Sequence, residues 1–171
     1  SGTGILKADD LLTDRDLAQT ADLADATYLT LADGQDLSIT EEGVYVVSGT
    51  ATNVTIRVEA DDAAKVQIVL DGASITSKTS AAVYVKSADK VFVTTAKGTD
   101  NSLANGGSFT ADGDTNVDGA VYAKDDITFN GSGSLTISSP AGHGVVGNDD
   151  VKFGGGTYVI TAAGHGVKAN D

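Results

Sequence analysis

The chain contains no cysteine, tryptophan or methionine, and only one proline and two histidines among its 171 residues. The missing cysteines exclude disulfides and thiolate metal sites, and two histidines make a histidine-rich zinc site an unpromising prediction. Eleven Lys and Arg stand against 24 Asp and Glu, a formal net charge of -13. This charge argues against nucleic acids and anionic membranes as partners, because like charges repel. The chain also lacks an apolar run of about 18 residues, so we expect no membrane insertion.

The apolar residues that remain indicate a β-rich protein. Hydrophobic residues make up 40% of the chain, aromatic residues only 5%, and glycine occurs 21 times. The core must therefore consist mainly of Val, Ile, Leu and Ala. Branched residues favour strands, and many glycines indicate many tight turns.

An internal repeat gives the strongest prediction of the fold. Residues 118–137, 142–160 and 164–171 align with one another, and Val121, Val145 and Val167 occupy the equivalent position in each. These valines are 24 and 22 residues apart, and a weaker copy at 82–93 has Val83 at the same position. Each copy contains three short bursts of alternating apolar residues separated by Gly, Asn or Asp. A repeat of this length with three short strands is typical of one rung of a β-solenoid.

We therefore predict an all-β parallel β-helix with about 22 residues per rung. Inward side chains of successive rungs should stack at roughly 4.8 Å, and the four equivalent valines should form one interior column. Residues 28–171 are assigned to the rungs, with a polar insertion at about 97–117. Residues 1–27 are expected to form an irregular N-terminal cap, either a short helix or an extended segment. The sequence stops inside a repeat, which predicts an open or truncated C-terminal end.

Acidic residues recur at equivalent positions and predict a calcium site. Asp89, Asp125, Asp149 and Asp171 align just before an inward strand, Asp126 and Asp150 extend the column, and Lys86, Lys124, Asn148 and Asn170 form a neighbouring column. Stacked carboxylates repel one another. Lysine can offset this repulsion in the early rungs, whereas the late rungs have Asn, and carboxylate and amide oxygens suit Ca²⁺. The candidate ligands are Asp125, Asp126, Asn148, Asp149, Asp150, Asn170 and Asp171.

A second candidate calcium site lies in the insertion. Asp112, Asp114, Asn116 and Asp118 place oxygen ligands at alternate positions, which partly matches the start of an EF-hand loop. The distal Glu of that loop is missing. For both acidic sets the alternative is turn chemistry, because Asp and Asn side chains bond nearby backbone N–H groups.

Three pairs of equivalent residues are candidates for contact with a ligand. His143 and His165 share a Gly-His-Gly setting and should stack, either as structural ladder residues at a corner or as a metal or sugar platform. Tyr84 and Tyr122 align at an outward position, where they either bind sugar rings or simply suit a strand surface. The remaining pair consists of Lys86 and Lys124.

Several segments together resemble one known family, the carbohydrate-binding parallel β-helix domains of secreted and surface proteins in clostridia and related Gram-positive bacteria. The matching segments are Leu12–Leu17, Ile39–Tyr45, Val69–Gly72, Tyr84–Val93 and Lys124–Ile137. The resemblance implies a right-handed parallel β-helix shaped like pectate lyases. It also implies binding of calcium and of acidic or cellulosic plant polysaccharides, in an extracellular or cell-surface protein.

The function expected from the sequence is non-catalytic, calcium-dependent polysaccharide binding. A structural stalk or filament subunit, joined end to end through the open solenoid edge, is one alternative. A polysaccharide lyase is the other, and it would need a Lys or Arg base beside the calcium. The two arginines, Arg15 and Arg57, lie away from the acidic columns in the sequence pattern, and a surface lysine beside aspartates has no desolvated pocket to lower its pKa. We therefore predict that the protein is not an enzyme.

Overall fold

The computed structural model describes residues 12–170, which form parallel strands after one short helix. The helix is α1 (Asp14–Leu17). The strands are β1 (Thr27–Thr30), β2 (Leu37–Ile39), β3 (Gly43–Thr52), β4 (Ile56–Glu59), β5 (Lys65–Ser77), β6 (Val83–Ser87), β7 (Lys90–Thr95), β8 (Asp100–Asn105), β9 (Gly119–Ala123), β10 (Asp126–Gly131), β11 (Ser134–Ser139), β12 (His143–Gly147), β13 (Val151–Phe153), β14 (Thr157–Ala162) and β15 (Val167–Ala169). No helix within residues 12–170 is long and apolar enough to cross a membrane.

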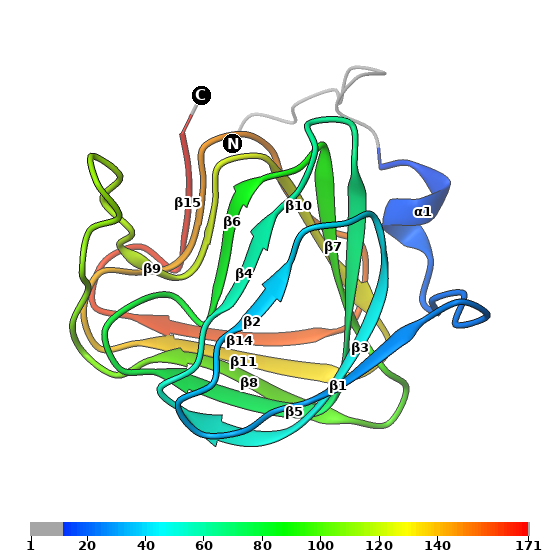
Figure 1. Ribbon diagram of the computed structural model, residues 1–171, viewed down its shortest axis with the longest axis horizontal. Helices are drawn as coiled ribbons and strands as arrows, with labels where there is room; N and C mark the ends of the chain where they lie inside the picture. Colours follow the sequence, from blue (N-terminus) through cyan, green and yellow to red (C-terminus); the bar gives the residue numbers. More distant parts are fainter. Residues whose placement is uncertain (1–11, 171) are drawn as a thin grey trace, which may run out of the picture.

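The strands form two parallel sheets that curl around a common interior (Figure 1). The first sheet has nine strands, in the order β13-β10-β7-β5-β8-β11-β14, with β3 on β5 and β1 on β3. The second has six strands, in the order β15-β12-β9-β6-β4-β2. The long strand β5 turns a corner, because its first half pairs with β7 and its second half with β8. The chain therefore returns repeatedly to the same faces, as in a β-helix-like fold.

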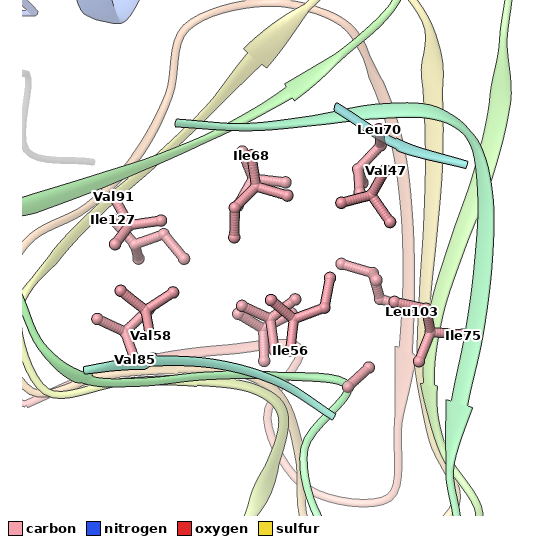
Figure 2. Close-up of a cluster of buried hydrophobic side chains, with 14 of the residues drawn as sticks. Val47, Ile56, Val58, Ile68, Leu70, Ile75, Val85, Val91, Leu103 and Ile127 are labelled. Carbon is pink, nitrogen blue, oxygen red and sulfur yellow. The ribbon is translucent and has the colours of Figure 1, made fainter. Parts of the chain in front are cut away.

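The interior is filled by columns of branched side chains. Figure 2 shows Val91 beside Ile127 and Val58 beside Val85, each pair from two neighbouring strands and pointing inward. The predicted valine column is also in register, since Val83 pairs with Val121 and Val145 pairs with both Val121 and Val167. The first three valines are fully buried, whereas Val167, in the edge strand β15, is 43% exposed.

The segment that leaves the strand pattern is shorter than the insertion expected at 97–117. That segment contains β8, which pairs with β5 and β11 inside the first sheet. Residues 106–118, between β8 and β9, leave the strand pattern, and we call them the cover segment. Val117 of the cover segment packs with Tyr84, Tyr122 and Val146 in a second, smaller apolar cluster outside the main core.

The N-terminal segment lies along the side of the coil. The expected cap comprised residues 1–27, of which 1–11 fall outside the described residues. Residues 12–26, here called the strap, contain α1, whose first turn is closed by a reciprocal capping box between Thr13 and Asp16. The strap contacts β5, β7 and β10 on their outer faces (Figure 1), so it covers a flank of the sheet.

Candidate functional site

Three aspartates meet where the second sheet passes into the first. Asp126 begins β10, and Asp149 and Asp150 occupy the turn between β12 and β13. One carboxylate oxygen from each lies within 4.8 Å of the others. The turn is held in place by the backbone N–H of Asp150, which donates to Asp126 Oδ1 at 3.0 Å. Stacking of the repeats thus converts an aligned Asp column into a local cluster, which we call the acidic edge.

The charges at the acidic edge are poorly compensated by the protein. Burial, followed by the nearby charges of Asp149 and Asp150, raises the pKa of Asp126. Burial also raises the pKa of Asp125, and its aspartate neighbours add to the shift. Within residues 12–170, the four aspartates 125, 126, 149 and 150 form no ion pair. Carboxylate oxygens that are not paired with a lysine or an arginine are hard donors of the kind that Ca²⁺ prefers.

In the earlier rungs, the aspartates at the equivalent position have partners within the protein. Asp89 pairs with Lys65, whose Nζ lies 2.7 Å from its carboxylate. Asp125 Oδ2 accepts from the backbone N–H of Ala88 at 3.1 Å. The compensating lysine is therefore Lys65, and not Lys86 or Lys124 of the predicted lysine column, because Lys86 pairs with Asp112 and Glu59 instead.

The asparagine column forms a side-chain ladder beside the acidic edge. Asn170 Nδ2 donates to Asn148 Oδ1 at 3.1 Å, and Asn148 Nδ2 donates to the Tyr122 hydroxyl at the same distance. Asp171, the last predicted ligand, lies outside the described residues. The asparagines therefore stack as expected, and Asn148 already uses its amide oxygen within the ladder.

The structure does not gather the aspartates of the cover segment into one site. Asp112 accepts from the Tyr84 hydroxyl at 2.8 Å, and its Oδ2 lies 3.3 Å from Lys86 and 3.6 Å from Arg57. Asp118 lies instead 3.7 Å from His143 Nε2. Among the described residues, the acidic edge is the only close group of three carboxylates or imidazoles. Asp114 and Asn116 remain exposed turn residues.

The expectation that Tyr84 and Tyr122 are exposed is wrong. Both point out of the main core, but the cover segment lies over them and leaves them 1% and 6% exposed. Their rings meet edge to face at 5.9 Å. Burial and the hydrogen bond to Asp112 raise the pKa of Tyr84 to about 12. The sequence signal for this cover was Val117, an apolar residue in a polar stretch.

The two histidines stack as predicted. Their rings lie 5.2 Å apart and 18° from parallel, and the backbone N–H of His165 donates to His143 Nδ1 at 2.8 Å. This bond shows that His143 Nδ1 is an acceptor, which places the proton of a neutral ring on Nε2, facing Asp118. This contact joins the two Gly-His-Gly segments of successive rungs.

A polar cleft of about 450 Å³ opens between the cover segment and the outer face of β2, β4 and β6. Hydroxyl and charged side chains dominate its lining, including Ser38, Thr55, Arg57, Ser80, Thr110 and Asp112. The Arg57 guanidinium lies 5.4 Å from the centre of the Tyr84 ring. The ammonium group of Lys86 lies 3.3 Å from Asp112, which lines the cleft. Lys124 does not line the cleft and is next to Asp125 in the chain. Sequence reasoning missed this cleft because its wall is the irregular cover segment.

Comparison with known proteins places this site in a family context. A family model described as "Carbohydrate-binding domain-containing protein" matches residues 33–171. A relative of the same description from Acetivibrio thermocellus is 35% identical over 130 residues, which cover 75% of this chain and 46% of the relative. The chain thus spans about half the length of that relative. The solved structure of the polysaccharide lyase-like protein from C. thermocellum, a gadolinium derivative, has a TM-score of 0.71 and 28% identity, covering 85% of this chain and 73% of that one.

Proposed function

The chain belongs to the family of carbohydrate-binding domain-containing proteins, and we propose that it is a non-catalytic domain that binds a polysaccharide with the help of calcium. The acidic edge carries this proposal. Three convergent carboxylates without a counter-charge are costly unless a cation joins them, because like charges at this separation repel. A protein of net charge -13 can hold an acidic glycan only where a bridging cation or its lysines offset the repulsion.

The residues that would hold the ion are Asp126, Asp149 and Asp150. Asp125 and Asn148 adjoin them in the chain and carry further oxygens of the kind Ca²⁺ accepts. Bound Ca²⁺ supplies positive charge with open coordination positions. The protein residues fix the oxygens in place, and the exposed positions of Asp149 and Asp150 leave the outer side open to a uronate carboxylate.

The absence of catalysis is proposed from the placement of the basic residues. Elimination from a uronate requires a base next to the carbon that loses its proton. Lys86 and Arg57 both lie against the Asp112 carboxylate. Asp112 therefore engages both basic side chains, and neither forms an ion pair with the aspartates of the acidic edge. Lys124 is next to Asp125 in the chain, and no ion pair within residues 12–170 fixes its side chain at the acidic edge.

The polar cleft offers a second contact region for the same polymer. Its hydroxyl side chains and Arg57 present hydrogen-bonding groups of the kind that suit a sugar ring. We propose either an acidic or a cellulosic glycan as the ligand. We also propose that the coil is right-handed and that the protein is extracellular or on the cell surface. The structural alternative is self-association through the end of the coil.

A retention assay on immobilised polygalacturonate tests the proposal. The wild-type chain should be retained in millimolar calcium and released by chelator, while Asp149→Asn should weaken retention and Asp114→Asn, an equal charge change in the exposed cover segment, should not. Ultraviolet absorbance of unsaturated products is followed in the same tubes. Growth of that absorbance would identify a lyase, and retention that is indifferent to chelator would refute the calcium role.

A further inference from the structure

The strap covers a strip of the sheet whose composition is unusual for an outer face. The strip consists of the outward side chains of β5, β7 and β10, namely Gln67, Lys90, Phe92, Thr94, Thr128 and Asn130. Their neighbours along each strand belong to the main core, so these six side chains point the other way. Five are nevertheless buried: Gln67, Phe92, Thr94, Thr128 and Asn130 are each less than 5% exposed.

The strip is an ordered hydrogen-bonding surface. Gln67 Nε2 donates to Thr94 Oγ1 at 2.8 Å, and Thr94 in turn donates to Asn130 Oδ1. Asn130 Nδ2 is then left to donate outward, and it reaches the backbone carbonyls of Arg15 and Asp16 at 3.0 and 3.2 Å. The three strands therefore present preoriented donors on an exterior face, where a sheet normally meets water.

Asp16 places a carboxylate in the middle of this surface. Its side chain is fully buried, forms an ion pair with Lys90, and accepts from Thr128 Oγ1 at 2.8 Å. Lys152 of β13 adds a second ammonium group at 3.9 Å. Beside it, the Arg15 guanidinium lies 4.3 Å from the centre of the Phe92 ring. Two lysines and one hydroxyl of the strands thus converge on one carboxylate next to an aromatic face.

We propose that this strip is a binding site for the carboxylate of an acidic sugar, and that Asp16 occupies it as an intramolecular stand-in. This inference rests on the proposed binding of an acidic glycan, but it places that glycan on a different face from the acidic edge. Ammonium and hydroxyl donors recognise a uronate carboxylate as they recognise Asp16. Phe92, freed of Arg15, offers an apolar ring for the sugar face.

The strap is built to be displaced by a competing carboxylate. Its helix has four residues, and its leucines Leu17 and Leu23 are 49% and 44% exposed, so these two side chains contribute little apolar burial. Its main attachments are the polar contacts of Arg15 and Asp16, with Gln19 donating to the Gly154 carbonyl at 3.1 Å. An external ligand must compete with a tethered carboxylate at high effective concentration, so the apparent affinity of the wild-type chain is the intrinsic affinity multiplied by the fraction of molecules whose strap is open.

The test is titration of the full chain with trigalacturonate in the presence of chelator, which removes any calcium-bridged binding. Asp16→Asn should tighten binding at least about tenfold over wild type, because the closed strap no longer competes with a carboxylate of its own. Trypsin should also cut faster after Arg15 as the strap opens. Asp14→Asn, the same charge change at an exposed position of the same helix, should alter neither quantity. The double variant D16N/K90M should not show this tighter binding, because it lacks the ammonium group that pairs with the ligand carboxylate.

Two results would overturn the inference. Faster cleavage of D16N without tighter binding would make the strap a structural clasp only, and unchanged cleavage would show that Asp16 does not hold it. If D16N fails to fold, Thr13→Ala, which opens the capping box and leaves the strip intact, should tighten binding in the same direction, and no tightening would count against the site. Calcium-dependent retention of wild type on polygalacturonate is measured separately, so failure here leaves the proposed function standing.

Discussion

The valine column permits a paired test of the stacked interior. Val145 and Val167 face each other in adjacent strands, yet Val145 is fully buried and Val167 is 43% exposed. Replacing Val145 by Ala removes two methyl groups, worth about 1.6 kcal/mol of transfer free energy at about 0.8 kcal/mol each. The unfilled space adds to this loss, so the free energy of unfolding should fall by about 2–3 kcal/mol. Val167→Ala should cost less than about 1 kcal/mol, because much of that side chain already meets water.

Urea unfolding followed by circular dichroism measures the difference. Both variants lose the same β-branched residue, so the comparison holds the chemical change constant and varies the burial of the site, together with its place in an internal or an edge strand. With a slope of about 2–3 kcal/mol per molar urea, the midpoint of Val145→Ala should fall by about 1 M and that of Val167→Ala by about a third of this or less. Equal shifts would refute the reasoning, since they would mean that the two valines share one environment. Val145→Asp should prevent folding, because an unpaired buried charge costs several kcal/mol.

Two further predictions concern local contacts. Burial opposes ionisation of Asp16, but hydrogen bonds from Lys90 and other donors outweigh it and lower its pKa to about 2. The ionised carboxylate therefore favours the docked strap by on the order of 1–2 kcal/mol above pH 4, and this contribution is lost as pH falls from about 4 to 2; a carboxyl NMR titration with a midpoint near 4 would contradict it. Gly131 has φ +102° and a Cβ there would lie 2.2 Å from the Thr95 carbonyl oxygen, so Gly131→Ala should lower the melting temperature far more than Gly72→Ala, where φ is +71° but the space is open.

The repeat carried most of the fold prediction because stacking in a parallel coil is periodic. Equivalent positions 22 to 24 residues apart must meet across neighbouring strands, so the register of Val121, Val145 and Val167 followed directly from alignment. The histidine stack followed for the same reason. Where regularity is weaker, the face of a strand was less readable. Val44 and Val46 mark β3 by alternation, yet the residues that pair with core positions of β5 are Tyr45 and Val47.

The parts that the sequence did not predict are the two layers outside the coil. The cover segment buries Tyr84 and Tyr122, and the strap buries Asp16, through contacts between residues 28 to 112 positions apart. Such contacts obey no period, because each occurs once in the chain. Asp16 reads as a surface residue in an acidic stretch, and only the lysines and Thr128 of distant strands make its burial favourable.

Charge along the coil shows why repeat symmetry alone does not define a site. The same column position is neutralised by Lys65 at Asp89 and receives a backbone hydrogen bond at Asp125. At Asp149 it meets neither a lysine nor an arginine, while Asp126 and Asp150 draw close. Stacking places an aspartate at this position in successive rungs. Whether a lysine or an arginine lies nearby determines which rung has uncompensated carboxylates. Metal binding is therefore expected at the late rungs and disfavoured at Asp89, whose carboxylate Lys65 already occupies.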